Sequence, residues 1–383
     1  MYDVIVIGSG PAGLICAREL FLSGFRVLIL EKNDVVGKKL SITGGGRCNL
    51  FNYKEKSELV EKIHNGEFLR YGFVKYNSAF FWNYFSSVGL KKEERDRVFP
   101  ISNKSKDVID FLRDNVEIEL NSNVASIEKN ESFSVFTEKE KYQSKYVVIA
   151  TGGLSYPQLG SDGAGYDFAK SFGHSIVNTY PALSPLKTEK HDLAGITVEG
   201  GVFSCDKKTF GSILFTHDGL SGPAVYDISA YVGDFVFIDF LVDMDEKLFL
   251  EKVTRYSQKK MISSFMKEFI PNRIVDEVFL RNKIFDKKIA EISKKDRAFL
   301  FESFKSFKLM VKSKDIDRSI VTGGGICLDE ICADTMESRK VDNLYFVGEI
   351  LDLHGPTGGY NIMISLLTGI LASKSIEKKS KLC

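Results

Sequence analysis

The apolar pattern at the start of the chain predicts a strand, a helix and a second strand in quick succession. Residues 3–7 read DVIVI, a β-branched run typical of a central parallel strand that is buried on both faces. Residues 14–24 have the apolar spacing of a helix and end at Gly24. A second apolar run, Arg26–Leu30, then leads to Glu31. This order predicts an α/β domain built on a parallel sheet.

The turn between the first strand and the helix consists of Gly8, Ser9, Gly10, Pro11, Ala12 and Gly13. Gly8 permits a tight turn, Gly10 lets the backbone approach a pyrophosphate, and Gly13 lets helix and strand pack closely. The helix N-terminus adds N–H groups and a positive dipole end. Glu31 is placed to accept from both ribose hydroxyls of an adenosine and would repel a 2′-phosphate, which disfavours NADP. The pattern predicts a dinucleotide site rather than a purely structural turn. Lys32 is included as a contact, although a solvated loop lysine is the simpler interpretation.

A second glycine-rich segment, residues 37–49, indicates which dinucleotide to expect. It reads GKKLSITGGGRCN, and three consecutive glycines are poor helix and strand formers. We expect a loop whose bare backbone lies against a ring system or phosphates, with a flexible surface loop as the alternative. The candidate contacts here are Lys39, Leu40, Gly45, Gly46, Arg47, Cys48 and Asn49. Arg47 would supply a permanent cation. Cys48 could be a redox thiol, but without a partner cysteine a packing role is expected.

The following segment contains helical and then strand-like patterns. Residues 78–89 and 105–114 have helical spacing and are expected to cross to a third strand. Short β-type runs between Val116 and Tyr142 predict a meander, and the buried run Tyr146–Ala150 follows it. A meander before a strand that ends in A-T-G-G is the pattern of a flavoprotein nucleotide domain. The candidate contacts here are Val124, Thr151, Gly152 and Gly153.

No second dinucleotide fingerprint is found. Gly160, Gly163 and Gly165 resemble one only superficially, because no buried strand precedes them. We interpret them as the entry to a helix near Gly163. A separate NAD(P)H domain is therefore not expected.

The pattern changes twice in the second half of the chain. Alternating strands predominate from about Leu186 to Asp243, and helical spacing rich in Lys, Phe and Glu follows in residues 245–310. The basic stretches of this helical part are interleaved with acids, which favours solvated helix faces over an RNA surface. Residues 344–347 then predict a strand that leads into a glycine-rich turn and an amphipathic helix.

This last segment suits a flavin. A carboxylate and an amide can accept from ribityl hydroxyls, and helix N–H groups can face the pyrimidine edge. The candidate contacts are Gly348, Glu349, Gly358, Gly359, Tyr360 and Asn361. We therefore expect a discontinuous FAD-binding domain of residues 1–185 and 320–383. A β-rich insert of residues 186–244 and 311–319 and a helical insert of residues 245–310 would interrupt it.

Composition narrows the class of protein. The chain has 383 residues, is 44% hydrophobic, and balances 52 Lys and Arg against 51 Asp and Glu. The apolar fraction excludes a disordered chain, and a net charge of +1 gives no electrostatic case for a nucleic-acid or membrane-surface binder. The 6 cysteines show no metal-type spacing, so no metal site is expected. Without a secretory leader pattern or a membrane-length apolar run, we expect a cytoplasmic protein.

Four segments carry a family resemblance: GKKLSITGGGRCN, FTHDGLSGPA, TGGG and VGEILDLHGPTGGYN. Together they resemble a bacterial family of aminoacetone-oxidase-like FAD-binding flavoproteins, which includes bile-acid-pathway flavin reductases. The resemblance implies a glutathione-reductase-like FAD-binding Rossmann domain, interrupted by a β-barrel-like subdomain and a small helical subdomain. It implies FAD contacts at Gly8, Gly10, Ala12, Gly13, Glu31, Lys39, Arg47, Gly152, Glu349, Gly359 and Asn361. His354 departs from the family pattern, in which this position is more often acidic.

We expect an FAD-dependent oxidoreductase that passes a hydride through flavin N5 to an enone-type small molecule, with transient NAD(P)H as donor. The candidates for polarising a carbonyl or donating a proton are His217, Tyr360, His354 and Tyr156. Each has a structural alternative, such as bracing a turn or packing over the cofactor. An oxygen-dependent amine oxidase is one other possible function, and an RNA-associated flavoprotein that uses the helical insert is another. We expect a monomer or homodimer without a nucleic-acid or membrane partner.

Overall fold

The computed structural model describes residues 1–381 and divides into two compact units. The first unit comprises Met1–Pro181 and Ile316–Cys383, and the second comprises Ala182–Asp315. Both ends of the chain therefore belong to the first unit. Within residues 1–381, no helix is long and apolar enough to cross a membrane.

A seven-stranded sheet forms the centre of the first unit, with the order β6-β2-β1-β9-β8-β7 and β18 beside β9. The strands are β1 (Tyr2–Ile7), β2 (Val27–Leu30), β6 (Glu117–Glu119), β7 (Val124–Lys129), β8 (Phe133–Thr137), β9 (Lys141–Ile149) and β18 (Leu344–Phe346). The pairs β2–β6, β1–β2, β1–β9 and β9–β18 are parallel, and β7–β8–β9 is an antiparallel meander. The predicted α/β fold with a parallel core is confirmed.

Two strand predictions need correction. The first part of the predicted meander does not belong to it, because Glu117–Glu119 form a parallel strand beside β2. The last run of the predicted meander and the buried run Tyr146–Ala150 are not separate strands, because Lys141–Ile149 form the single strand β9. Polar and buried residues alternate in the first half of β9, where it closes the meander, and its second half is buried throughout between β1 and β18.

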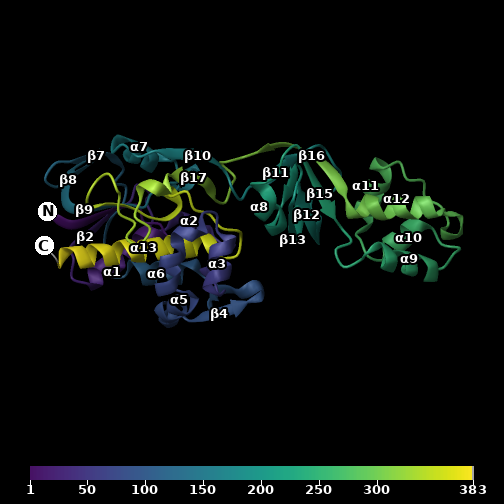
Figure 1. Cartoon of the computed structure of the whole chain (residues 1–383), viewed down its shortest axis with the longest axis horizontal. Coiled ribbons are helices and arrows are strands. Elements are labelled where there is room, and N and C mark those ends of the chain that lie inside the picture. Colours follow the sequence, from purple (N-terminus) through teal and green to yellow (C-terminus); the bar gives the residue numbers. More distant parts are fainter. Residues whose placement is uncertain (382–383) are drawn as a thin grey trace. The chain divides into compact units, whose positions relative to one another are not determined.

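Helices surround this sheet (Figure 1). They are α1 (Pro11–Leu22), α2 (Lys38–Ile42), α3 (Lys56–Lys62), α4 (Arg70–Lys75), α5 (Ser78–Tyr84), α6 (Ser105–Arg113), α7 (Ala164–Ser171) and α13 (Tyr360–Ser380). The two ends of the chain meet where α1 packs along α13. Gly369 permits this approach, since a Cβ there would lie 2.5 Å from the Ala12 carbonyl oxygen.

Two small sheets complete the first unit. One is a three-stranded sheet of β3 (Phe51–Asn52), β4 (Leu90–Glu93) and β5 (Arg97–Pro100), which the sequence pattern did not indicate. The other pairs β10 (Ile176–Pro181) with β17 (Thr322–Ile326) in antiparallel fashion.

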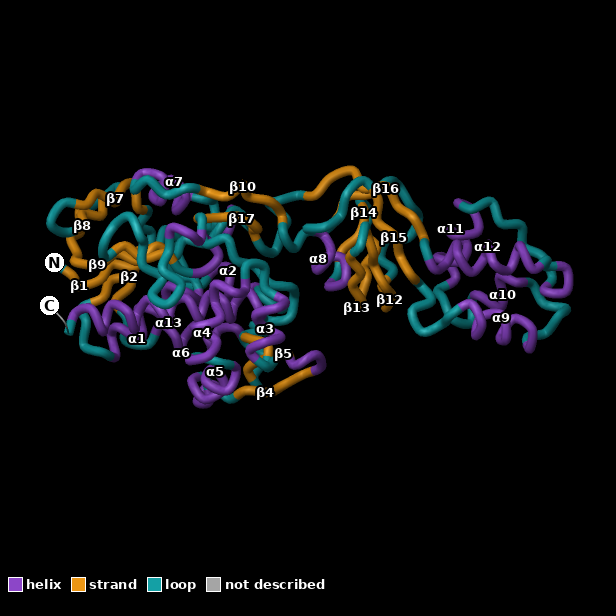
Figure 2. The backbone as a smooth tube through the Cα atoms, in the orientation of Figure 1, coloured by secondary structure: helices purple, strands orange, loops and turns teal. Residues whose placement is uncertain are grey.

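The second unit contains a closed antiparallel barrel with the strand order β11-β14-β13-β12-β15-β16. Its strands are β11 (Leu186–Thr188), β12 (Thr197–Ser204), β13 (Lys207–Phe215), β14 (Gly219–Ser221), β15 (Phe235–Asp239) and β16 (Phe307–Lys314). The helices are α8 (Pro223–Ser229), α9 (Glu246–Arg255), α10 (Ile262–Met266), α11 (Asn272–Arg281) and α12 (Lys294–Lys305). The predicted barrel-like part and helical part are both present (Figure 2). Two details differ, because α8 lies within the strand-rich region and β16 begins before residue 310.

One buried carboxylate links the barrel to its helices. The side chain of Asp239 is 1% exposed and lies 2.9 Å from the Lys208 ammonium and 3.1 Å from that of Lys305 at the end of α12. A buried charge needs such partners, because removing a carboxylate from water is costly. Barrel and helix residues accordingly share one hydrophobic core.

Candidate cofactor site

The turn after β1 has the geometry that the glycine pattern predicted. Gly8 has φ 104°, and a Cβ there would lie 2.6 Å from the Ala150 carbonyl oxygen. A Cβ on Gly13 would lie 2.1 Å from the Gly8 carbonyl oxygen, so helix α1 can pack this closely only with glycine. A Cβ on Gly10, by contrast, would have no atom within 4 Å. The protein itself needs Gly8 and Gly13, whereas the open space at Gly10 fits a bound pyrophosphate.

Glu31 lies beside this turn and is 6% exposed. Its carboxylate accepts from the Ser9 backbone N–H (2.8 Å) and hydroxyl (2.6 Å), and from the Asn33 backbone N–H (2.8 Å) and side-chain amide (2.7 Å). Ser9 therefore orients Glu31. Since these four bonds fill the usual acceptor positions of a carboxylate, a ribose hydroxyl would replace the Ser9 hydroxyl or the Asn33 amide.

Lys32 is not simply solvated, because its ammonium lies 2.6 Å from the Asp162 carboxylate. Asp162 belongs to the loop that precedes α7, and Gly163 is the N-cap of that helix with φ 85°. The predicted helix entry near Gly163 is thus correct. The ion pair ties the segment after β2 to this loop.

The second glycine-rich segment forms α2 followed by a turn. Gly44, Gly45 and Gly46 have φ values of 59°, 68° and 84°, a left-handed run that other residues rarely adopt. A Cβ on Gly45 would have no atom within 4 Å, so bare backbone faces open space there. The Arg47 guanidinium lies 3.1 Å from Glu93 and 4.2 Å from the centre of the Phe99 ring. Its charge is therefore already balanced by a protein carboxylate.

Neighbouring residues of this segment take structural positions. Leu40 is 2% exposed and belongs to the core. Cys48 is fully buried, and burial raises the pKa of its thiol to about 12. A thiol that stays protonated at neutral pH suits packing rather than redox chemistry. The buried side-chain oxygen of Asn49 has no hydrogen-bond partner within residues 1–381, which fits a polar ligand at this position.

A second carboxylate lies on the short helix η7 (Gly348–Ile350), directly after β18. The Glu349 carboxylate lies 2.8 Å from the Lys39 ammonium, and it accepts from the Ser155 hydroxyl at 2.6 Å and the Thr322 backbone N–H at 2.9 Å. Although burial opposes ionisation, Lys39 and these hydrogen bonds hold the pKa of Glu349 below its ordinary value. Three distant segments thus converge on one ionised carboxylate.

Thr322 and Ser155 were not among the predicted site residues. The Thr322 hydroxyl accepts from the backbone N–H groups of Leu154 and Ser155, at 2.8 and 3.0 Å. Gly153 makes room for it, because a Cβ there would lie 2.5 Å from the Thr322 hydroxyl oxygen. A lone threonine before a glycine cluster gave no separate signal for this role.

Strand packing accounts for the glycine cluster of β17. A Cβ on Gly323 would lie 2.5 Å from the Tyr180 ring, one on Gly324 would lie 2.3 Å from the Asn178 carbonyl oxygen, and one on Gly325 would lie 2.5 Å from the Ile350 carbonyl oxygen. These glycines let β17 contact β10 and η7 closely. The TGGG segment of the family resemblance therefore has a packing role in this protein.

The strand end after β9 carries another polar atom suited to a ligand. The Thr151 hydroxyl is buried and has no hydrogen-bond partner within residues 1–381. Gly152 follows with φ 76°, and a Cβ there would lie 2.9 Å from the Ser161 hydroxyl. Val124, the other predicted contact of this region, is 7% exposed at the start of β7.

The turn before α13 is held by its own residues. The Asn361 side chain accepts from the Gly355 N–H at 2.9 Å and donates to the Gly355 carbonyl at 2.9 Å. Gly358 accepts from the Asn52 amide at 3.0 Å, and Gly359 has φ 98° as the N-cap of α13. Tyr360 is 3% exposed and packs in the core. Asn361 therefore shapes this turn, and Tyr360 has little surface for a catalytic contact.

A group of titratable side chains adjoins the Glu349 network. The Tyr180 hydroxyl at the end of β10 lies 2.9 Å from His354 Nε2, and the His354 ring stacks on that of His64 with centroids 4.8 Å apart. His64 Nε2 lies 3.7 Å from the buried Asp352 carboxylate. Burial and the neighbouring His64 lower the pKa of His354 to about 4, although Glu349 acts in the opposite direction. His354 is thus neutral at physiological pH.

The two remaining predicted catalytic residues lie in different units. Tyr156 is half-buried with φ 59° and precedes the short helix η4 (Pro157–Leu159) of the first unit. His217 belongs to the second unit, where it is exposed in the turn between β13 and β14. The Thr216 N–H donates to the Gly219 carbonyl at 2.8 Å across that turn. The structure therefore does not place His217 within the cofactor-binding unit.

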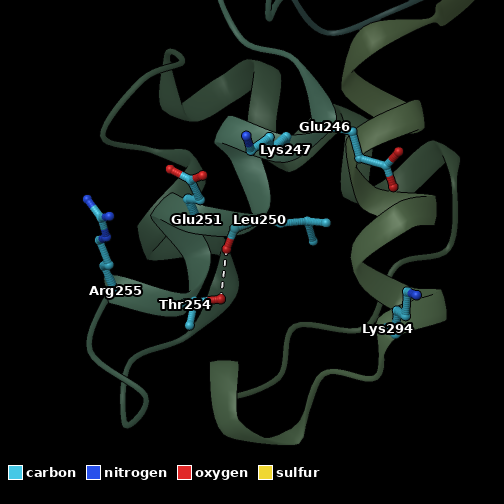
Figure 3. Close-up of a pocket in the computed structure, with 7 residues that line it drawn as sticks. All are labelled: Glu246, Lys247, Leu250, Glu251, Thr254, Arg255 and Lys294. Atoms are coloured by element: carbon cyan, nitrogen blue, oxygen red, sulfur yellow. Dashed lines mark hydrogen bonds between the residues drawn. The ribbon is translucent and has the colours of Figure 1, made fainter.

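The second unit also has an open pocket between α9 and the start of α12 (Figure 3). It is lined by Glu246, Lys247, Leu250, Glu251, Thr254, Arg255 and Lys294. Its charges are of both signs, and the lining contains no glycine, so it lacks the features of a dinucleotide site. In the described part of the chain, no group of three or more His, Cys, Asp or Glu side chains could hold a metal ion.

The comparison with protein families agrees with this geometry. Residues 2–375 match the model described as the HI0933-like protein Rossmann domain. The chain belongs to the HI0933-like family. This is an FAD-binding Rossmann family, and the chain is an FAD-dependent oxidoreductase, as its sequence predicted. The turn at Gly10, the loop at Gly45 and the unpartnered oxygens of Asn49 and Thr151 fit such a cofactor.

Two HI0933-like relatives match over nearly the whole chain. The ribosomal RNA dihydrouridine synthase of Escherichia coli is 32% identical, with 94% of each chain covered. The 3-dehydro-bile acid delta(4,6)-reductase of Clostridium scindens is 28% identical over 99% of this chain and 100% of its own. The predicted flavoprotein family with bile-acid reductases is thus confirmed, whereas the narrower aminoacetone-oxidase label is not supported by these relatives.

Solved structures show the same fold. The 3-ketosteroid-delta4-(5alpha)-dehydrogenase of Rhodococcus jostii aligns with a TM-score of 0.53 at 13% identity, covering 98% of this chain and 96% of its own. A flavocytochrome c3 fumarate reductase aligns with a TM-score of 0.50 at 17% identity, covering 98% and 78%. At these identities the likeness concerns the fold alone.

Proposed function

We propose that this HI0933-like protein reduces a carbon–carbon double bond that is conjugated with a carbonyl group. The names of both full-length relatives denote this chemistry. Dihydrouridine is uridine whose C5=C6 bond, conjugated with the C4 carbonyl, has been saturated. A delta(4,6)-reductase of a 3-dehydro substrate acts on double bonds conjugated with a C3 carbonyl. The common substrate feature is an enone-type system.

The observation that carries the proposal is the Tyr180–His354 pair. Hydride addition to the β-carbon of an enone leaves negative charge on the carbonyl oxygen, and the α-carbon must then be protonated. The Tyr180 hydroxyl lies 2.9 Å from His354 Nε2, so the two side chains form one hydrogen-bonded acid–base pair that would supply this proton. Because His354 is neutral, the pair adds no positive charge beside Glu349, which acts on the pKa of His354.

The bound FAD would supply the hydride, and the chain's own residues would hold it. Gly10 and the α1 N-terminus would take the pyrophosphate, and Glu31 the ribose. The Lys39–Ser155–Glu349 network would lie toward the flavin, where it keeps a fixed carboxylate and ammonium in place. NAD(P)H would be the transient donor, which docks against the flavin without a fingerprint of its own.

Anaerobic half-reactions test the proposal. NADH or NADPH should bleach the flavin absorbance rapidly, and an enone or a uridine-containing RNA should then restore it. Bleaching by an amine such as aminoacetone, with restoration only by oxygen, would instead establish the amine oxidase that the sequence left open.

A tyrosine variant separates the two half-reactions. Tyr180→Phe should leave flavin bleaching unchanged and slow its restoration by substrate, because only the second step needs the proton. We expect the rate of restoration to fall roughly 10²-fold or more, which is the usual contribution of a positioned acid. The control is Tyr53→Phe, which changes a tyrosine that directly follows β3 and is 37% exposed. Equal restoration rates in both variants would exclude Tyr180 as the proton donor.

A further inference from the structure

Four barrel strands place two phenylalanines between two lysines in one row. Phe203 of β12 is directly opposite Phe237 of β15, Lys208 of β13 is opposite Phe203, and Lys308 of β16 is opposite Phe237. The two rings stack with centroids 5.2 Å apart and planes 13° from parallel. Residues beside them on the same strands, such as Val202, are fully buried. Because side chains alternate along a strand, the row lies on the outside of the barrel.

Two more phenylalanines extend this surface. Phe210 is 52% exposed and Phe235 is 38% exposed. The Lys308 ammonium lies 3.6 Å from the centre of the Phe235 ring, and the Lys208 ammonium lies 5.0 Å from that of Phe210. The set Phe203, Phe210, Phe235, Phe237, Lys208 and Lys308 is called the Phe–Lys face below.

The fold alone does not require this surface. The barrel is closed, so no further strand is needed to cover these rings. Asp239 pairs with Lys208, whereas Lys308 has no ion pair within residues 1–381. The exposed surface therefore combines flat rings with one lysine, Lys308, whose charge no carboxylate balances.

We propose that the Phe–Lys face binds single-stranded RNA. Unpaired bases would stack on the phenylalanine rings, and Lys308 would contact a phosphate, which is how sheet surfaces bind single strands. The choice of RNA rests on the proposed function, because a uracil base within RNA is an enone-type substrate. The net charge of +1 does not oppose this, since phosphate contacts depend on local lysines.

The proposal moves the RNA-binding platform from the helical part to the barrel. The helical part carries lysines interleaved with acids, and its pocket is lined by both signs of charge. The acids nearest the Phe–Lys face are Asp206 and Asp234 in the flanking turns, the exposed Glu199 farther along β12, and the buried Asp239. Glu199 is opposite Ser212, four residues from Phe203, and Asp239 pairs with Lys208, so no acid pairs with Lys308.

Fluorescence anisotropy tests the face with the FAD-loaded full-length protein. The probe is a fluorescein-labelled, uridine-rich single strand of ~12 nucleotides, within the usual site size of such surfaces. In the double variant Phe210→Leu with Phe235→Leu, the apolar surface remains but the rings are lost. We expect its affinity to fall about tenfold or more. Lys308→Gln should weaken binding and lower its dependence on salt. A duplex of the same sequence should bind more weakly, because its bases are already stacked.

The matched control changes the same residue types outside the face. Phe285→Leu with Lys259→Gln alters an 81% exposed ring and an exposed lysine in the helical part. It should bind RNA as the wild type does. Circular dichroism melting of all variants separates loss of binding from loss of folding.

Several results would overturn the proposal. The first is that the wild type does not bind the RNA probe at low salt. The second is that the variants of the Phe–Lys face and the control variant bind RNA with equal affinity. The third is that ultracentrifugation shows a dimer of the wild type that only the face variants abolish. The dimer would assign the face to a second copy of the chain. Reduction of a free enone, measured in parallel, tests the proposed function separately. If the enone is not reduced but RNA binding still depends on the Phe–Lys face, the proposed reductase activity is wrong and the RNA-binding face stands. If the enone is reduced but RNA binding does not depend on the face, only the RNA-binding proposal is wrong.

Discussion

The two carboxylates of the cofactor-binding unit, Glu31 and Glu349, are surrounded in different ways. Glu31 is held by Ser9 and Asn33, which lie within 22 residues of it along the chain, and all its partners are neutral donors. Glu349 is held by Lys39, 310 residues away, together with Ser155 and Thr322. The first site forms within one βαβ unit, whereas the second exists only when four segments meet.

This difference has an energetic consequence. A site built from neighbouring residues depends on local backbone geometry, so its sensitive positions are the glycines of the turn. A site built from distant segments depends on burying and pairing charge. The residues whose substitution affects its stability most are therefore the titratable ones. The four predictions below test this contrast, from the largest expected effect on stability to the smallest.

Gly13→Ala should destabilise the protein most, by roughly 3–5 kcal/mol, because backbone cannot move away as a flexible side chain can. The added Cβ would lie 2.1 Å from the Gly8 carbonyl oxygen. Thermal and urea unfolding of the FAD-free protein measure this loss in the free energy of unfolding. A change below about 1 kcal/mol would show that the turn Gly8–Gly13 beside Glu31 is less rigid than the structure implies.

The second prediction concerns pH and His354. Its pKa is lowered by burial from 6.5 in the unfolded chain to about 4 in the folded protein. Below pH 6.5 the unfolded chain takes up the proton first, so the free energy of unfolding falls until about pH 4, by up to about 3 kcal/mol, and then levels off. His354→Gln should remove this part of the pH dependence. The exposed His217→Gln variant is the control, and equal slopes in both variants would contradict the assignment.

Glu349→Gln should cost about 2 kcal/mol, because it leaves the Lys39 ammonium without its carboxylate in a site where the Glu349 side chain is only 17% exposed. Since the pKa of Glu349 is lowered in the folded protein, the wild type should lose the same contribution as the pH falls below the ordinary glutamate range. Glu67→Gln, which breaks an exposed pair with Arg70, should not change the unfolding midpoint. Similar effects of the two variants would mean that the buried Glu349 network stabilises the protein no more than an exposed ion pair does.

Gly10→Ala should hardly change stability, within about 1 kcal/mol, because its Cβ would meet no protein atom within 4 Å. It should instead weaken FAD binding by roughly tenfold or more, since the methyl group occupies the space for the pyrophosphate. Isothermal titration with FAD measures this. Gly13→Ala, three residues away, is the comparison, and unchanged FAD affinity in Gly10→Ala would place the cofactor elsewhere.

Local patterns predicted much of the fold and the first half of the site. The βαβ start, the helix entry at Gly163 and the strands after Leu186 follow from runs of apolar residues and turns, which depend on neighbours in sequence. The closure of those strands into a barrel was implied by the family resemblance and not by the pattern. The division of β9 into two runs was wrong, because polar residues at its start mark an exposed face and not a break. The packing role of the cluster Gly323–Gly325 was not predicted, because the sequence does not show which backbone approaches which.

The sequence by itself determined the dinucleotide class of the cofactor, since the turn Gly8–Gly13 and Glu31 belong to one βαβ unit and Ser9 bonds Glu31 within it. Only the tertiary structure decided that Thr322 and Ser155 belong to the Glu349 network and that Tyr180, 174 residues from His354, is its hydrogen-bond partner. It also decided that Phe203 and Phe237 stack between two lysines. Such contacts depend on strand register and on the packing of distant segments, which no local pattern encodes.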